Sequence, residues 1–197
     1  MNNSKFKNKP NEATTTVDGR KIWLSRSIAV VCQVVIRNTQ TNEFYTAIVK
    51  RGPASLGSIG LWCYPCGYLD WNETTREAAI RETFEEAGLD IENLISTPQS
   101  KFVMKFPILH TSPWHVDSIP EHQRQNVSLS HCFYFETDGS VDLPIISSVN
   151  CEEGEIDRVK WVTLKEVIGS TEYPMAFDHH LVTVELTAKI NELISKE

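Results

Sequence analysis

Three carboxylates at helical spacing give this sequence its clearest chemical potential. Glu82, Glu85 and Glu86 stand at positions i, i+3 and i+4, so a helix with about 100° per residue gathers them on one side. Like charges at this spacing repel by roughly 0.2–0.5 kcal/mol per pair, and acids near a helix C-terminus oppose its dipole. A solvent-exposed acidic face is the simplest interpretation. The alternative is a divalent cation such as Mg²⁺, which prefers carboxylate oxygens and shares its remaining positions with water and phosphate.

The helix that would carry these acids is the longest helical pattern of the chain. It is predicted over residues 73–87, and Gly88 follows in the capping position that favours glycine. Placed on a helical wheel, the residues expected to face the core, opposite the acids, are Ile80, Phe84 and Ala87.

The segments around this helix predict a single domain of mixed α/β (α+β) class. Apolar runs predict strands at residues 28–36, 44–50, 102–109, 127–136 and 159–162. A last amphipathic helix is predicted over 177–195, and the loops at about 110–125 and 138–154 are long enough to carry function. We therefore expect one domain over 20–197, preceded by a polar segment over 1–19 that forms a flexible tail or a short arm.

Composition and charge narrow the class of partner. The 197 residues include 26 acids and 19 bases, a net charge of -7, which argues against a sequence-independent grip on nucleic acid. An acidic protein still binds phosphate groups where a divalent cation lies between them. The chain shows no apolar run long enough to cross a bilayer and no signal peptide at its start, so we expect a cytoplasmic protein with no membrane partner.

One pair of the five cysteines has spacing that could bind a metal or form a redox centre. Cys63 and Cys66 form a C-x-x-C, but the sequence offers no second pair to close a zinc site. In one extended strand, residues three apart point to opposite faces, so the two thiols are expected to diverge. Two incidental thiols are favoured over a redox or zinc pair.

The segment from Gly67 to Leu89 resembles the Nudix box, G-x5-E-x7-R-E-U-x-E-E-x-G-U, where U is a bulky aliphatic residue. The matching residues are Gly67, Glu73, Arg81, Glu82, Glu85, Glu86, Gly88 and Leu89. Thr83 departs from the pattern at the first aliphatic position, where we expect it to affect packing. The resemblance implies a Nudix αβα sandwich with a mixed central sheet. It also implies hydrolysis of the pyrophosphate linkage in a nucleoside diphosphate derivative.

The resemblance also implies roles for individual residues. Mg²⁺ or Mn²⁺ would be held by Glu82, Glu85 and Glu86, together with a backbone carbonyl at Cys66 or Gly67. Either Glu82 or a loop acid would serve as the base. Arg81 and Glu73 would hold the catalytic carboxylates in place.

Candidates outside the box are fewer and each has a plain alternative. One loop acid is expected to bind metal or act as base, chosen from Glu152, Glu153 and Glu155, with a solvated acidic loop as the alternative. Lys50 and Arg51 end a predicted strand and could contact phosphate, or simply be solvated. Two aromatic residues on loops are candidates for substrate contact, Trp71 and Trp114.

The substrate and the assembly are the least defined expectations. Residues 175–181 resemble the start of the last helix in ADP-ribose pyrophosphatase-like Nudix proteins, which favours ADP-ribose or a nucleotide sugar. Family resemblance also implies a possible homodimer. The competing hypothesis is a Nudix domain that senses a ligand without turnover; the intact acidic positions of the box favour an enzyme.

Overall fold

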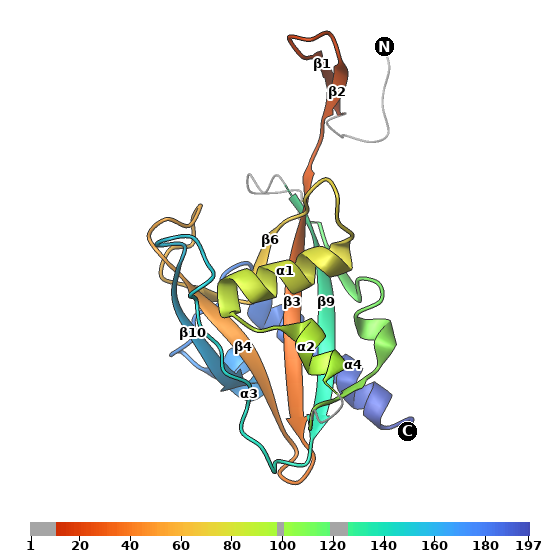
Figure 1. Ribbon diagram of the computed structural model, residues 1–197, viewed down its shortest axis with the longest axis vertical. Coiled ribbons are helices and arrows are strands. Elements are labelled where there is room, and N and C mark those ends of the chain that lie inside the picture. The colour runs from red at the N-terminus through yellow and green to blue at the C-terminus, as the bar shows by residue number, and fades with distance from the viewer. Residues whose placement is uncertain (1–10, 98–100, 119–125) are drawn as a thin grey trace, which may run out of the picture.

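A mixed β-sheet forms the centre of the computed structural model, which describes residues 11–97, 101–118 and 126–197 (Figure 1). Its eight strands follow the order β10-β4-β3-β9-β7, with β5 paired to β4, β6 to β3 and β8 to β9. Their bounds are β3 Ser27–Asn38, β4 Glu43–Arg51, β5 Trp62–Cys63, β6 Cys66–Tyr68, β7 Val103–Lys105, β8 His115–Asp117, β9 Asn126–Thr137 and β10 Ile156–Thr163. The two long central strands, β3 and β9, run parallel, and the other pairs are antiparallel.

Helices cover both faces of this sheet. Helices α1 (Thr75–Ala87) and α2 (Ile91–Ser96) lie on one face in Figure 1, and α4 (His179–Ile194) lies on the other. The short α3 (Leu164–Gly169) follows β10 and contacts α4, and the 3-10 turn η1 is Pro107–Leu109. The predicted αβα sandwich is confirmed. Within the described ranges, no helix is long and apolar enough to cross a membrane.

The side chains of β3 and β9 divide the core into two layers. On the α1 side, Val34 and Ile36 cluster with Phe133 and Phe135. On the α4 side, the neighbouring β-strand positions Val35, Cys132 and Tyr134 cluster with Leu186 and Ile190 of α4. Because successive strand residues point to opposite faces, the continuous apolar runs in the sequence serve two layers at once.

Strand β3 shares one edge between two partners, and this opens the sheet where the acids lie. Its first half pairs with β6, with Val31 opposite Cys66, while its second half pairs with β4, with Val35 opposite Thr46. The backbone N–H of Cys32 donates to the carbonyl of Pro65, which holds the link between β5 and β6 in the sheet. Helix α1 packs over β6, so the backbone of β6 lies directly beneath the acidic helix.

The ends of α1 follow from its sequence. Thr74 caps the N-terminus in a capping box with Glu77, and Gly88 ends the helix at φ 65. The predicted helix and its glycine cap are confirmed, although the helix begins two residues later than the predicted residue 73.

The predicted core-facing stripe of α1 holds for Ala87, which is buried, and for Ile80, which packs against the core, but it is wrong for Phe84. Phe84 is 44% exposed, and the residues that α1 buries are Ala78, Ala79, Glu82, Thr83, Glu86 and Ala87. The helix rests on the sheet through small side chains, so two of the three acids point inward. A helical wheel orders the side chains around the axis, but the direction of the sheet depends on tertiary packing.

The segment expected to be a flexible tail or a short arm over 1–19 contains a strand. Strand β1 (Glu12–Thr15) pairs with β2 (Lys21–Leu24) in an antiparallel hairpin that extends away from the body in Figure 1. Residue types explain the hairpin, because β-branched Thr14 and Thr15 precede, and Ile22 follows, a turn in which Gly19 adopts φ 84. Residues 1–10 lie outside the described part.

The strand predicted over 102–109 is also shorter than expected. Strand β7 ends at Lys105, Phe106 adopts φ 51, and Pro107 begins a 3-10 turn. Proline lacks the N–H that a sheet requires, which stops the strand.

Candidate active site

A cavity of about 670 Å³ lies between α1, β6, the end of β4 and the loop that precedes β10. Among the residues that the structure describes, six carboxylate residues line it, namely Glu82, Glu85, Glu86, Asp117, Glu152 and Glu155, and Arg51 is the single Lys or Arg. This charge imbalance is the main electrostatic feature of the cavity. It suits a site that binds cations together with an anionic ligand.

Glu82 rests against the backbone of Gly67. A Cβ atom placed on Gly67 would stand 2.2 Å from Oε1 of Glu82, so a side chain at this position is incompatible with the observed carboxylate. The glycine that begins the Nudix-like motif therefore makes room for an acid on the facing helix. It also brings a carboxylate next to the backbone predicted to supply a metal ligand.

Glu86 is the most deeply buried of the three helix acids. Its side chain is 2% exposed, and its Oε2 accepts a hydrogen bond of 2.9 Å from the backbone N–H of Cys66. Burial raises the pKa of the Glu86 carboxyl well above its ordinary value, and the nearby Cys66, Glu82 and Glu155 add to the effect. Burial also raises the pKa of Glu82. Both acids are held where a cation would relieve the cost of their charge.

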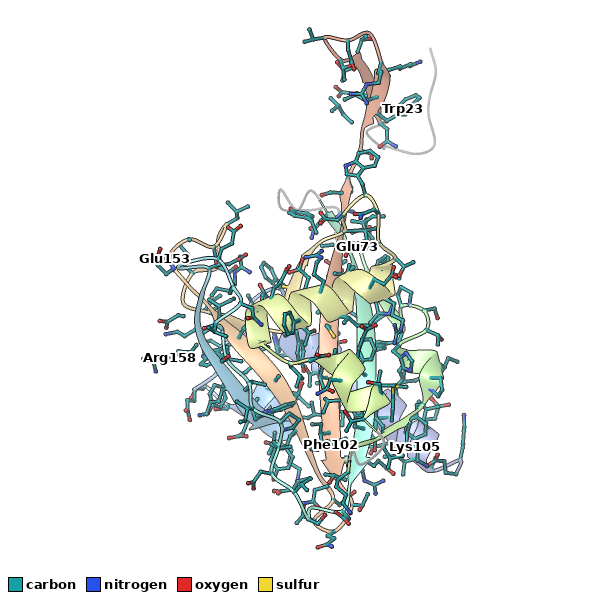
Figure 2. All side chains as sticks on the ribbon, viewed as in Figure 1. Trp23, Glu73, Phe102, Lys105, Glu153 and Arg158 are labelled. Carbon is teal, nitrogen blue, oxygen red and sulfur yellow. The ribbon has the colours of Figure 1, made fainter. Side chains whose placement is uncertain are left out.

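Arg81 connects the acids on one side of the cavity. Its guanidinium donates to both oxygens of Glu73, at 2.7 and 3.0 Å, and to Glu82 and Glu85 at 2.7 and 2.9 Å. A further bond of 3.1 Å reaches the carbonyl of Tyr68. The bond to Arg81 lowers the pKa of Glu73, which keeps this pair ionised. Figure 2 shows Glu73 beside the start of α1. It bonds to Arg81 without lining the cavity itself.

The donor atoms fit a hard divalent cation. Three carboxylates and the adjoining backbone carbonyls of Cys66 and Gly67 are oxygen ligands of the kind that Mg²⁺ and Mn²⁺ prefer. Within the described residues, no three His, Cys, Asp or Glu side chains gather closely enough to hold a metal as they stand. Glu82 and Glu85 each bond to Arg81 through one carboxylate oxygen, which leaves the other oxygen of each for a cation.

Three predicted residues outside the helix and the β6 backbone also reach this cavity, namely Arg51, Glu152 and Glu155. Glu155 lines it, and its charge contributes to the raised pKa values of Glu82 and Glu86. Its Oε2 accepts a hydrogen bond of 3.3 Å from the thiol of Cys151. Arg51 lines the same cavity from the end of β4.

The remaining predicted residues lie elsewhere. Glu153 is exposed on the loop at the edge of the molecule in Figure 2 and does not line the cavity. Lys50 faces a second cavity, Trp71 is fully exposed, and the indole N–H of Trp114 donates to Gln33 at 3.1 Å. Neighbouring residues of a strand point to opposite faces, which explains why Lys50 and Arg51 separate.

The expected divergence of Cys63 and Cys66 is wrong. The Cys63 thiol lies near enough to act as a hydrogen-bond partner of Cys66, and this contact and burial raise the pKa of the Cys66 thiol. The two residues belong to different strands, β5 and β6, joined by Tyr64 and Pro65. The alternation rule for one continuous strand therefore does not apply to them.

Sequence reasoning did not single out the residues of the cavity wall formed by β8, β9 and the start of α4. These are Asp117, Asn126, Ser128, Ser130, Phe177, His179 and Val182, and they are joined by His115 of the loop predicted at 110–125. The similarity noted over 175–181 was the one sequence signal that fell on this wall. The loop predicted at 110–125 contains β8, and its residues 119–125 lie outside the described part.

Comparison with known sequences places the chain among characterised families. The sequence profile of the NUDIX domain matches residues 28–185. An RNA pyrophosphohydrolase from Bartonella bacilliformis is 34% identical over 110 residues, or 56% of this chain. The chain spans 61% of the length of this curated relative.

Three solved structures share the fold. A MutT/nudix family protein from Enterococcus faecalis superposes with a TM-score of 0.59 at 17% identity, over 85% of this chain and 63% of that one. The NUDIX domain of Shewanella oneidensis NrtR, complexed with ADP ribose, gives 0.56 at 16% identity, over 84% and 89%. A bifunctional NMN adenylyltransferase/ADP ribose pyrophosphatase from Francisella tularensis, complexed with AMP and Mn ion, gives 0.54 at 22% identity, over 83% and 42%.

Proposed function

From the premise that the chain belongs to the NUDIX domain family, we propose that it is a pyrophosphohydrolase dependent on Mg²⁺ or Mn²⁺. Its substrate is a nucleoside diphosphate derivative, cleaved at the pyrophosphate linkage to a nucleoside monophosphate and a second phosphate compound. The observation that carries this proposal is the cavity lined by six carboxylates and one arginine. A small anionic substrate binds there only where cations offset the acids.

The proposed mechanism assigns a task to each group of the cavity. Glu82, Glu85 and Glu86, with the carbonyls of Cys66 and Gly67, would hold the cation. When bound, such an ion polarises a water molecule and neutralises charge on the pyrophosphate. Arg81 limits the rotamers of the acids that it bonds. Its bonds to both oxygens of Glu73 hold the guanidinium in place.

Proton transfer falls to an acid on the cavity wall. Glu155, held by the Cys151 thiol, accepts the proton of the attacking water, with Glu82 as the alternative base. The water oxygen bonds to phosphorus as the bond from that phosphorus to the bridging oxygen breaks. Arg51 contacts the charged phosphoryl oxygens from the opposite side of the cavity.

Metal-dependent product release tests this function. We expect hydrolysis of one class among ADP-ribose, nucleotide sugars, dinucleoside polyphosphates, NADH and (d)NTPs with Mg²⁺ or Mn²⁺, and none with EDTA. ADP-ribose is the substrate to test first, because one structural neighbour is complexed with ADP ribose and another is an ADP ribose pyrophosphatase. A 5′-triphosphorylated oligoribonucleotide belongs in the panel because of the RNA pyrophosphohydrolase relative. Turnover that persists in EDTA would contradict the metal assignment.

The alternative function is ligand sensing without turnover. The NrtR neighbour binds ADP ribose in its NUDIX domain, which makes binding alone a specific alternative. A compound that raises the melting temperature of this chain but remains intact would favour that alternative.

We also propose that the chain forms a homodimer through its N-terminal hairpin. Every residue of β1 and β2 is exposed, including Trp23 at 64%, which Figure 2 shows on the arm away from the sheet. An isolated two-stranded hairpin is marginally stable in water, so the arm needs a surface to pack on. Residues 1–26 carry six bases and two acids, against 13 bases and 24 acids in the remainder, which favours the acidic body of a second copy.

Light scattering of the full chain tests the dimer. We expect a dimer for the wild-type chain at micromolar concentration and a monomer for Trp23→Glu, which places a charge on the apolar arm. A monomeric wild-type chain at 50 times that concentration would overturn this proposal.

A further inference from the structure

Two consecutive residues before α4 adopt an unusual backbone. Phe177 and Asp178 have φ of 59 and 57, in the left-handed region that non-glycine residues seldom occupy. Bulky L-residues enter this region at a cost in free energy, so it persists where the surroundings fix it. The consequence of this bend is that Phe177 forms part of the cavity wall.

Contacts on both sides hold Phe177 in this position. The N–H of Ala176 donates to the carbonyl of Trp62 at 2.7 Å. On the other side, the ring of His179 meets Phe177 edge-on, with centroids 5.6 Å apart. The Nδ1 atom of this histidine accepts a hydrogen bond of 3.1 Å from the N–H of Tyr64. The strained segment is thus tied to the chain between β5 and β6, next to the acids.

Phe177 lies against the one arginine of the cavity. The Cζ atom of Arg51 stands 5.2 Å from the centre of the Phe177 ring, within the range of a cation–π contact. The Nε–H of the same arginine donates to the carbonyl of Gly57 at 2.9 Å. Among the described residues, no hydrogen bond uses its two Nη atoms. A planar guanidinium fixed by its Nε and by a ring retains the paired donors that match two phosphoryl oxygens.

We propose that Phe177 is a positioning residue for Arg51. It holds the guanidinium as a fork for the phosphoryl group of the substrate, and the left-handed backbone exists to place its ring. This inference rests on the proposed function and adds a residue to it. Phe177 acts through Arg51 and has no role in proton transfer or metal binding.

A double-mutant cycle on Phe177 and Arg51 tests the inference. The variants are Phe177→Leu, Phe177→Tyr, Arg51→Ala and the double variant Arg51→Ala/Phe177→Leu, with ADP-ribose or the fastest panel compound as substrate. We expect Phe177→Leu to raise KM about tenfold, as befits a partly desolvated cation–π contact, with kcat within threefold of wild type. Phe177→Tyr retains a ring and keeps KM within twofold.

Coupling separates positioning from simple packing. In the Arg51→Ala chain, Phe177→Leu is expected to add less than twofold to KM, because the group it positions has gone. The matched control is Phe44→Leu, since Arg37 covers the Phe44 ring at 5.7 Å outside the cavity. This control is expected to leave KM unchanged.

The outcomes that contradict the inference differ from those that contradict the hydrolase. Equal KM for Phe177→Leu and wild type, or additive effects in the cycle, would overturn the positioning role while hydrolysis stands. If the wild-type chain binds ADP-ribose with Ca²⁺ but hydrolyses no panel compound with Mg²⁺ or Mn²⁺, the proposed hydrolase activity is contradicted. The same cycle on Kd then decides the role of Phe177. Absence of both binding and turnover across the panel overturns both proposals.

Discussion

Two cavities that are lined by neighbouring residues at the end of β4 differ in the sign of most of their charged side chains. Six carboxylates face the first, whereas Lys50, Arg158 and Lys160 face the second, a hollow of about 540 Å³. Each of the three cations has an acidic partner, at 3.3 Å for Lys50 with Asp157, 3.7 Å for Arg158 with Asp157 and 3.5 Å for Lys160 with Glu172. At the first cavity, Arg81 bonds to Glu82 and Glu85, while the carboxylate of Glu86 accepts a hydrogen bond from the backbone N–H of Cys66.

The difference shows that balance of charge separates the two cavities better than size does. Exposed ion pairs contribute little to stability and leave little net field. The second cavity should therefore attract an anion only weakly. Buried acids without full pairing are costly to the fold. Acids kept in a cavity at this cost are expected to have a function, and metal binding is the function that we propose.

The largest expected effect comes from the helix acids. Glu85→Gln and Glu86→Gln each remove a carboxylate charge at nearly constant volume, and we expect kcat to fall by at least roughly 100-fold. Steady-state kinetics with Mg²⁺ measure the loss, and circular dichroism checks that the fold is intact. Glu92→Gln on α2 is the matched control. Activity preserved in both Glu85→Gln and Glu86→Gln would contradict the metal assignment.

A smaller loss is expected from Gly67→Ala. The new Cβ would stand 2.2 Å from Oε1 of Glu82, so this carboxylate must move. We expect kcat to fall about tenfold and metal affinity to weaken, measured by titration of activity with Mg²⁺. Gly169→Ala is the control, because a Cβ there meets nothing within 4 Å. Equal kinetics for the two alanine variants would show that Glu82 need not lie against the glycine.

Stability against pH should reveal the cost of burying Glu86. The pKa of the Glu86 carboxyl is about 4.5 in the unfolded chain and is raised in the folded chain. At pH values between the unfolded and the folded pKa, the folded chain therefore binds more protons than the unfolded chain. The contribution of Glu86 to the free energy of unfolding therefore falls as pH rises through this window. In EDTA, the free energy of unfolding of Glu86→Gln should exceed that of the wild type by about 1 kcal/mol or more at pH 8. The two free energies should be equal near pH 4.5.

Urea unfolding at both pH values measures this difference. Added Mg²⁺ should stabilise the wild type at pH 8 and leave Glu86→Gln nearly unaffected. A variant less stable than the wild type at pH 8 in EDTA would mean that Glu86 supports the fold rather than burdening it.

The smallest effects are expected in the second cavity. Arg158→Ala leaves Asp157 paired with Lys50, and Lys160→Ala leaves Glu172 bonded to the hydroxyl of Tyr173. Both changes lie at the surface, so we expect KM and kcat within twofold of wild type. The substrate that shows the Glu86→Gln loss serves for this measurement. A tenfold rise in KM for either variant would make the second cavity part of the substrate site and end the contrast drawn above.

Local sequence patterns predicted much of the fold. The apolar runs placed β3, β4, β9 and β10, because buried strands in a covered sheet must be continuously apolar. The Gly88 cap ended α1 where predicted. Strand β1 was missed because its threonines look polar, although their β-branched shape favours strands.

Part of the candidate site follows from local sequence, and part depends on contacts between distant segments. Spacing along one helix placed Glu82, Glu85 and Glu86 together, because neighbours on a helix are fixed by its geometry. Which way the helix faces was decided by packing, since Ala79 and Thr83 fit the sheet and Phe84 does not. The helical wheel had no information about the surface beneath it.

The sequence by itself determined the family, the acidic helix and the strands that carry it, since each depends on residues within about 25 positions of one another. Tertiary structure alone decided which residues complete the cavity. Arg51, Glu155 and Phe177 come from three distant segments, and they meet because β4, the loop before β10 and the start of α4 converge on one opening of the sheet. Contacts at such separations depend on how the strands pair, and a single sequence does not record that pairing.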